Sequence, residues 1–452
     1  MSPNKHDLLS DDIAHTLKRM TLPMILGMIL LMTFSLVDTF FVSLLGTEQL
    51  AAISFTFPVT FTVISLNIGL GIGTSAVIGR VLGSGKLEDA KQIATAALVL
   101  SALLVGGLAL IGLFAIDTIF MAMAATEALL PYIKAYMVPW YAAGVFLAIP
   151  MVGNSVLRAS GDTKTPSIIM AVGGAINAAL DPLLIFGLGP IPAMGIAGAA
   201  IATIISWAIG AVWIIYLLAY KRRLMEPRIL PWRVFKTSSK GVLKIGLPAA
   251  GANMLTPVAN GIVTAFVASY GAAAVAAWGV GNRLESIASI VVLALSMSLP
   301  PFISQNFGAG KLDRVAAAYK ICARFVLVWQ LVVFILLWSM ADTIALVFSD
   351  ESAVASNIVL FLSIVPLAYG IQGIVILANS SFNAMHQPFS ALALSIIRLF
   401  VVYIPIVYVA GEWFGLIGIF WGCVIANMLT ACIAYWWFNQ SIQKQITSSV
   451  SN

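Results

Sequence analysis

Side chains that can handle an ion are rare inside the long apolar runs of this sequence, and three of them stand out. Asp38 lies deep in the apolar run 17–45, which is long enough to cross the roughly 30 Å hydrocarbon core of a bilayer as a helix. Asn177 and Asp181 lie four residues apart in the run 166–187, so a helix projects both from one face. An aspartate inside a bilayer costs about 2.5–3.5 kcal/mol and usually marks an ion or proton pathway. For Asp38, a simple hydrogen bond between helices is the alternative.

The two aspartates suggest proton chemistry. If they share a pocket of low dielectric constant, desolvation and mutual repulsion favour protonation of at least one of them. A sodium ion held by the same oxygen atoms is the competing interpretation. The embedded polar set of this half also includes side chains in other apolar runs: Tyr136, Asn154, Thr203 and Ser206.

The second half carries different embedded charges, chiefly Glu285 and Arg398. Arg398 is about nine residues into the run 389–410, which places it about 13 Å deep at 1.5 Å per residue. At that depth its charge does not easily reach water along the lipid face. We therefore expect Glu285 and Arg398 to form a structural ion pair, with a substrate-binding role as the alternative.

The run that contains Asp38 has two further features. Met24, Met28 and Met32 recur at intervals of four, which places their thioethers on one helical face, for packing or for contact with a substrate. Pro23 lacks an N–H and bends the helix nearby. We hypothesise that protonation of Asp38 or Asp181 shifts a straight–bent equilibrium at Pro23, and a static kink is the alternative.

Other chemistries have little support. The glycine-rich link 79–86 has Arg80 where a phosphate-binding loop needs its first glycine, and Leu87 where it needs Ser or Thr. The three cysteines have no metal-ligand spacing and the three histidines are scattered. No convergent set of His, Ser or metal ligands is visible. We therefore expect no enzyme activity, no metal site and no cofactor, with H⁺ or Na⁺ as the coupling ion.

The overall composition indicates the class of protein in which these side chains are held. Of 452 residues, 61% are hydrophobic and only 9% are charged, as in a polytopic membrane protein. The apolar runs predict twelve spans: 17–45, 51–79, 92–116, 131–157, 166–187, 195–220, 242–269, 275–304, 317–347, 354–384, 389–410 and 415–438. Lys and Arg gather in the links after even-numbered spans, which predicts that these links and both termini are cytoplasmic. The net charge of +6 therefore reflects topology and not nucleic-acid binding. We also expect no signal peptide before the first span.

An internal repeat organises the spans. At an offset of 225 residues, Leu22-Pro23 matches Leu247-Pro248, and the match continues to Asn154-Ser155 against 379–380. Each half has an even number of spans, so the copies are parallel repeats. The predicted fold is all-α, with two six-helix bundles, 1–220 and 242–452, joined by a cytoplasmic link, 221–241, and facing a central cavity. Gly69 and Gly73 have a spacing that lets helices approach closely.

Together these features resemble the multidrug and toxic compound extrusion (MATE) transporters, and within them the DinF-like branch. The similarity covers nearly the whole chain. It rests on the two Leu-Pro openings, Val-Asp-Thr at 37–39, Gly-Asp-Thr-Lys-Thr-Pro at 161–166, and Asn177 with Asp181 before Pro182. The resemblance implies export of bulky, usually cationic amphiphilic compounds in exchange for H⁺ or Na⁺ by alternating access.

The resemblance also implies roles for particular residues. Asp38, Asn177, Asp181 and Thr203 look like the cation-site residues of the first lobe, and Tyr136 and Asn154 look like members of the adjoining polar network. The segments 245–269 and 354–384 hold no Asp or Glu, so we do not expect the second-lobe cation site of the NorM-like branch.

A flippase for lipid-linked precursors is the alternative function, because that group has a similar architecture. It would favour a strongly cationic cavity, whereas the first half offers aspartates. We expect small-molecule drugs or toxic compounds and the lipid bilayer as partners, no nucleic acid, a monomeric state, and a location in the cytoplasmic (inner) membrane.

Overall fold

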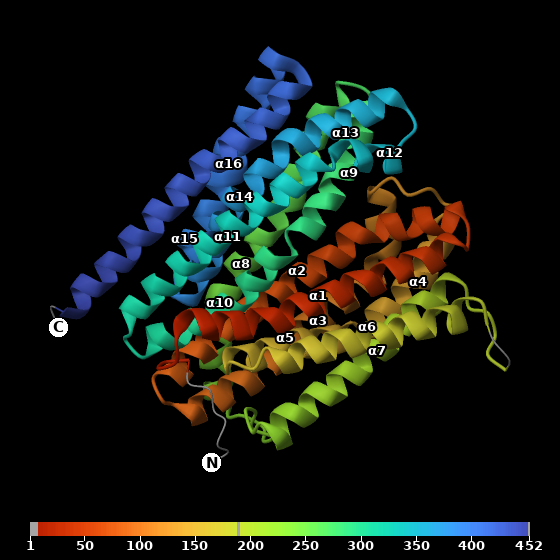
Figure 1. Ribbon diagram of the computed structural model, residues 1–452. Coiled ribbons are helices and arrows are strands. Elements are labelled where there is room, and N and C mark those ends of the chain that lie inside the picture. Colours follow the sequence, from red (N-terminus) through yellow and green to blue (C-terminus); the bar gives the residue numbers. More distant parts are fainter. Residues whose placement is uncertain (1–7, 188–189, 451–452) are drawn as a thin grey trace. The chain divides into compact units, whose positions relative to one another are not determined.

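The computed structural model describes residues 8–187 and 190–450, and every element in this part of the chain is a helix (Figure 1). The elements of the first half are α1 (Ile13–Ser43), α2 (Thr47–Gly83), α3 (Leu87–Ala122), α4 (Leu130–Ala142), α5 (Gly144–Ala159), α6 (Lys164–Ile185), α7 (Ile196–Tyr216) and the π-helical turn η1 (Leu217–Lys221).

The second half repeats this order with more breaks. Its elements are α8 (Trp232–Ala268), α9 (Ala272–Ala288), α10 (Ile290–Gly308), α11 (Leu312–Ser339), α12 (Ala341–Phe348), α13 (Ser352–Ile364), the 3₁₀ turn η2 (Val365–Ala368), α14 (Tyr369–Ala384), α15 (Pro388–Ile396), the π-helical η3 (Ile397–Tyr403) and α16 (Ile404–Val450).

The helices account for the twelve predicted spans. In the described residues, ten helical stretches are long and apolar enough to cross a membrane, and α4 with α5, bent by 53°, forms an eleventh. One of the ten, Pro388–Ser448, has 61 residues. A straight helix of that length would extend about 90 Å, about three times the hydrocarbon core, so it must contain two spans.

The chain reverses direction inside α16. Gly415 has φ 67° and ψ −150°, a non-helical conformation that suits glycine. Beyond it, the Cα of Val407 lies only 3.0 Å from where a Cβ on Gly422 would be, although a straight helix would separate these residues by about 22 Å. The Tyr403 hydroxyl also donates a hydrogen bond to the Cys423 sulfur at 3.2 Å. The predicted runs 389–410 and 415–438 are therefore two antiparallel spans.

The packing divides the chain into two compact units. We call Leu22–Ala250 the N unit, and we call the described parts of Met1–Thr21 and Gly251–Asn452 the C unit. The predicted divisions 1–220, 221–241 and 242–452 follow the sequence repeat, whereas the compact units divide inside two helices. The chain passes from one unit to the other within α1 and again within α8, close to Pro23 and Pro248. These prolines belong to the two repeated Leu-Pro pairs.

Within the N unit, the beginning of α8 packs against α2 through glycines. A Cβ on Gly69 would overlap the carbonyl oxygen of Gly246, and a Cβ on Gly73 would lie 3.0 Å from the amide nitrogen of Gly246. The small-residue spacing predicted to allow close helix approach is therefore used for that purpose.

Within the C unit, the beginning of α1 packs against α10 and α11. The hydroxyl oxygens of Thr21 and Ser298 lie 2.7 Å apart and are buried. The guanidinium of Arg314 donates to the carbonyl oxygens of Leu8 at 3.3 Å and Asp11 at 2.6 Å. The start of α1 is thus fixed to the C unit by both apolar and polar contacts.

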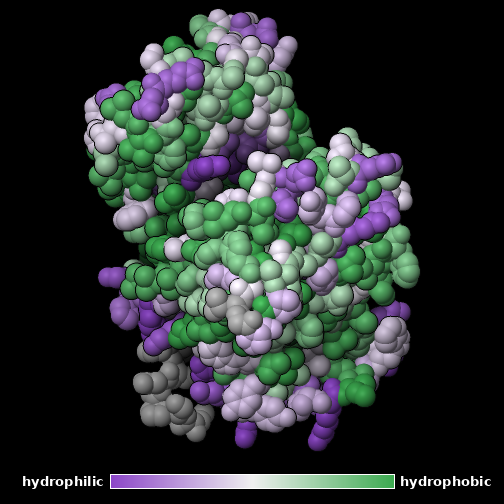
Figure 2. All heavy atoms as spheres, turned by 90° about the vertical axis from the view of Figure 1, so that its right-hand side faces the viewer, coloured by the Kyte–Doolittle hydropathy of each residue, from purple (hydrophilic) through white to green (hydrophobic). Residues whose placement is uncertain are grey.

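Large apolar side chains are exposed on the outer helices. Phe114 of α3 is 90% exposed and Val212 of α7 is 69% exposed. Hydrophobic side chains cover much of the face seen in Figure 2. Such a surface is unfavourable in water but suits contact with lipid chains. The chain is an integral membrane protein.

Candidate functional site

The polar side chains of α6 and α7 form one hydrogen-bonded network in the N unit. Asn177 and Asp181 lie one turn apart on α6, and the Asn177 amide donates to the Asp181 carboxylate at 3.4 Å. The same amide donates to the Thr203 hydroxyl on α7 at 3.2 Å. Thr203 in turn donates to the carbonyl oxygen of Ala199 at 3.0 Å, a bond within its own helix. Asn177 thereby links the carboxylate to the neighbouring helix.

Asp181 is buried and incompletely satisfied. Its side chain is 0% exposed, and its Oδ2 atom has no hydrogen-bond partner in the described part of the protein. Asp38 of α1 lies close enough to this carboxyl group to interact with it electrostatically. Two carboxylates cannot donate to each other, so a bond between them requires a proton on one. The pair can hold one proton between two oxygens.

Tyr136 and Asn154 approach this pair differently. Tyr136 of α4 lies within electrostatic range of both Asp38 and Asp181, so the structure brings it to the aspartates. Asn154 of α5 is 7% exposed, and its Oδ1 atom has no partner among the described residues. Asn154 forms no hydrogen bond with either aspartate in this part of the chain.

The methionines of α1 occupy two kinds of environment. Met24 is 0% exposed and Met28 is 9% exposed, whereas Met32 is only partly buried. The hydroxyl of Ser167 on α6 lies 3.4 Å from the Met24 sulfur and donates to it. In this conformation Met24 therefore packs between helices of the N unit. Pro23 lies one residue before it, at the point where α1 passes between the compact units.

The expected ion pair between Glu285 and Arg398 is not formed, which corrects the prediction from the sequence. Glu285 of α9 instead accepts a hydrogen bond from the Gln372 amide of α14 at 3.1 Å. Arg398 of η3 lies within electrostatic range of Glu285, but the described residues give its buried Nε atom no partner. Gln372 satisfies the carboxylate without a second buried charge. The sequence pointed to the two charges but gave no signal for this neutral amide.

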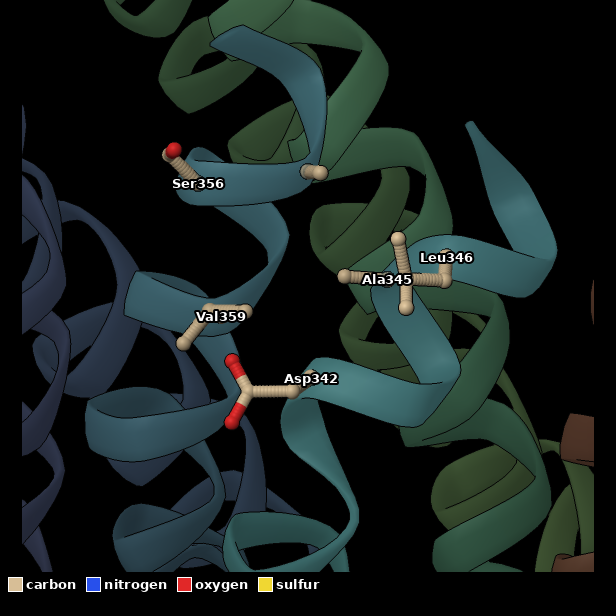
Figure 3. Close-up of a pocket in the computed structure, with 6 residues that line it drawn as sticks. Asp342, Ala345, Leu346, Ser356 and Val359 are labelled. Carbon is tan, nitrogen blue, oxygen red and sulfur yellow. The ribbon is translucent and has the colours of Figure 1, made fainter. Parts of the chain in front are cut away.

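Other candidate sites are weaker. The described residues contain no group of three or more His, Cys, Asp or Glu side chains able to hold a metal ion. A surface pocket of about 360 Å³ in the C unit lies between α12 and α13 and contains Asp342, Ser356 and Val359 (Figure 3). None of the residues predicted to be functional lines it.

Comparison with known proteins gives consistent results. The MatE family model matches this chain twice, at residues 23–183 and 248–409. The FAD transporter of Shewanella oneidensis is 41% identical over 433 residues, which are 96% of each chain. The multidrug export protein MepA of Staphylococcus aureus is 26% identical over 422 residues, covering 92% of this chain and 91% of that protein. The MATE transporter VcmN of Vibrio cholerae, solved in a bent form, has a TM-score of 0.91 and 34% identity, covering 96% of this chain and 98% of its own.

The two matches to the family model coincide with the two halves of the internal repeat, and the most similar of these relatives aligns over almost the full length. All of these relatives are named as transporters or export proteins. The chain therefore belongs to the MatE family of membrane transporters.

Proposed function

We propose that this protein is a proton-coupled exporter of amphiphilic small molecules, in which Asp38 and Asp181 carry the coupling proton. The main support is that the buried Oδ2 of Asp181 has no partner among the described residues, while the Asp38 carboxyl group lies within electrostatic range of it. A proton arriving at the pair satisfies that oxygen and removes a negative charge from the membrane interior. Its departure restores an anionic site.

The network around the pair has a defined part in this proposal. Asn177 donates to Asp181 and also contacts Thr203, so a change in the charge of Asp181 alters the hydrogen bonds that join α6 and α7. Tyr136 lies close enough to respond electrostatically to both aspartates. Asn154 offers a second buried amide oxygen without a partner in the described residues. Proton binding is thereby linked to the packing of several helices.

Sodium is the competing coupling ion. Asp38, Asn177, Asp181 and Thr203 all carry oxygen atoms, which are the donors that hard cations prefer. The shortage of hydrogen-bond donors around Asp181 fits either ion. Proton coupling is our proposal because one proton suffices to satisfy the unpartnered oxygen, whereas a sodium ion needs several oxygens arranged around one point.

Two substrate classes remain as proposals. The MepA relative, a multidrug export protein, supports bulky amphiphilic compounds, often cationic, and an anionic pair such as Asp38 and Asp181 would attract them. The FAD transporter relative is 41% identical over 96% of the chain and favours a flavin nucleotide. Both classes contain flat aromatic groups, which methionine and aromatic side chains accommodate in many shapes. Flipping of a lipid-linked precursor is the remaining alternative.

We further propose that α1 bends at Pro23 as the protein alternates between outward-open and inward-open forms. Pro23 lies at the boundary between the compact units, so a change of angle there moves Met24, Met28 and Met32 relative to the part of α1 fixed to the C unit. The solved bent form of VcmN supports a bend in this family. The cytoplasmic termini, the inner-membrane location, the monomeric state and membership of the DinF-like branch also stay proposals.

Transport from proteoliposomes tests the function. The purified chain should drive efflux of ethidium or FAD when a pH gradient is imposed, and a sodium gradient alone should have no effect. Efflux driven by sodium at constant pH would reject proton coupling while keeping the exporter. Transbilayer movement of a labelled lipid-linked precursor, without efflux of either compound, would support the flippase instead.

A further inference from the structure

Arg398 is an embedded cation that forms no ion pair with any described residue. It lies about 15 Å along its helix from Pro388, well inside the hydrocarbon region. The described residues supply it with no ion pair and no hydrogen bond, and its Nε atom is buried. The residue as a whole is partly buried. A guanidinium without an ion pair or a hydrogen bond from the described residues therefore lies at membrane depth.

Glu285 lies within electrostatic range of this guanidinium, and two further polar groups of the C unit lie near Glu285. Glu285 uses one carboxylate oxygen to accept from Gln372, at 3.1 Å, and its second oxygen is not among the buried unpartnered atoms. Tyr369 is 3% exposed, its hydroxyl has no partner in the described residues, and it lies within electrostatic range of Glu285. Three helical elements, α9, α14 and η3, contribute to this cluster.

The internal repeat allows Arg398 to be compared with the part of the first copy that contains Asp181. Aligning Pro166 with Pro388, the first prolines of α6 and α15, shifts the offset to 222 residues. Asp181 then corresponds to Tyr403, the last residue of η3, and Ile176 corresponds to Arg398. The position of Asp181 thus holds the neutral Tyr403 in the second copy, and the cationic Arg398 lies five residues before it on the same element. The backbone here is π-helical, a local widening that is often found at functional sites.

A charge at this depth needs compensation. An unpaired arginine in the hydrocarbon region costs several kcal/mol, and the residues described here do not neutralise it directly. Water or a ligand must therefore satisfy the terminal nitrogens. The planar guanidinium offers two parallel N–H donors, which match the oxygens of a phosphate group better than a single water molecule does.

We propose that Arg398 binds a phosphate group of the transported substrate, while the open oxygen of Glu285 accepts a hydrogen bond from a hydroxyl or N–H group of the same molecule. The substrate class is thus an amphiphilic phosphate ester, such as a flavin nucleotide. This inference rests on the proposed export function and narrows its substrate. It assigns substrate binding to the C unit, separate from the proton pair of the N unit.

Flavin fluorescence provides the test, because riboflavin and FMN differ only by one phosphate group. The purified full-length protein in detergent should bind FMN more tightly than riboflavin. Arg398→Gln should weaken FMN binding about 10- to 100-fold, the range expected for a lost charge-assisted hydrogen bond. The same variant should leave riboflavin binding within about twofold. Arg398→Lys keeps the charge but lacks the planar guanidinium, so its FMN affinity should lie between those of the parent and Arg398→Gln.

Arg283→Gln is the matched control. Arg283 is exposed and sits two residues before Glu285, so it projects from a different side of α9. Its removal changes the net charge by the same amount and should leave both affinities unchanged. Thermal unfolding of each variant identifies loss of folding, and Arg398→Lys carries the test if Arg398→Gln does not fold.

Three outcomes would overturn the assignment. The first is that the parent shows no saturable FMN binding at millimolar concentration. The second is that Arg398→Gln loses FMN and riboflavin affinity equally. The third is that Arg283→Gln loses as much FMN affinity as Arg398→Gln does. Failure of the proposed export function gives a different result. In that case FMN preference persists in binding assays, while proteoliposomes show no proton-driven efflux.

Discussion

The hydroxyl oxygens of Thr21 and Ser298 lie 2.7 Å apart in the core of the C unit, and this contact fixes the first turns of α1 to α10. The internal repeat places Gly246 and Gly73 at the corresponding positions, where the two backbones touch within the N unit. Each copy therefore uses the same pair of positions to hold the beginning of its first helix. The hydrogen bond in one copy replaces direct backbone contact in the other.

Thr21→Val should lower stability modestly. It removes one buried hydrogen bond, which contributes about 1 kcal/mol. Ser298 keeps its bond to the carbonyl oxygen of Ala294 at 2.8 Å, so its hydroxyl is not left without a partner. The temperature of thermal unfolding in detergent measures the effect. Thr33→Val, at an exposed site on the same helix, is the control and should change stability by less than about 0.5 kcal/mol.

Gly69→Ala should destabilise the N unit by about 1–3 kcal/mol, because overpacking forces helices apart. The added Cβ would overlap the carbonyl oxygen of Gly246 and lie 2.6 Å from the amide nitrogen of Ala250. Gly107→Ala is the control, since a Cβ there meets nothing within 4 Å. That variant should be neutral or slightly stabilising, as helix propensity predicts. Equal thermal unfolding of the two variants would contradict the close packing of α2 on α8.

Asp38→Asn and Asp181→Asn should each abolish proton-driven efflux while leaving a folded protein. Each replaces a titratable oxygen with an amide of the same shape. Rates of efflux from proteoliposomes under a pH gradient measure the loss. Asp342→Asn, which removes a carboxylate from the surface pocket of the C unit, should transport as the parent does. Full transport by either site variant would contradict the assignment of Asp38 and Asp181 as the proton pair.

The pair also predicts how pH affects substrate binding. Protonation removes negative charge, so the affinity of the parent for a cationic substrate such as ethidium should fall as pH falls. In Asp38→Asn this dependence should be reduced, because one of the two coupled carboxyl groups no longer titrates. Equilibrium binding in detergent over a range of pH checks the slope. An unchanged slope in the variant would place the responsible group elsewhere.

Pro23→Ala should retain substrate binding but lose proton-driven efflux, because it restores a helical N–H and straightens α1. Structures of the parent at high and low pH should differ in α1, and those of the variant should not. Pro58→Ala, at an exposed proline inside α2, is the control and should keep efflux. If the parent has one shape of α1 at both pH values, the hinge is rejected even when Asp38 is essential.

Gln372→Leu should destabilise the C unit by about 1–3 kcal/mol, because it leaves a Glu285 oxygen without its donor. Glu285→Gln in the same chain should recover part of the loss by removing the charge. A double-mutant cycle between Glu285 and Arg398 should give a smaller coupling than the cycle between Glu285 and Gln372. A larger coupling between Glu285 and Arg398 would indicate that these two residues form an ion pair, which would contradict the structure.

Much of the candidate site followed from the sequence because its signals are local. The interval of four residues places Asn177 and Asp181 on one helical face, and the structure joins them by a hydrogen bond at 3.4 Å. The apolar runs likewise mark the spans, because backbone polar groups in lipid must be satisfied within a helix. The predicted run 415–438 begins at Gly415, whose positive φ makes the turn from the preceding span.

Only the tertiary structure decided which side chains meet across distant elements. Glu285 pairs with Gln372, 87 residues away, and a neutral glutamine gives no warning in a sequence searched for opposite charges. Thr21 belongs by packing to the C unit although it lies in the first predicted span, 17–45. The spacing of residues along a helix determines the directions in which their side chains project from that helix. The partner across a helix interface depends on how two surfaces fit, and many weak contacts between residues far apart in the chain determine that fit.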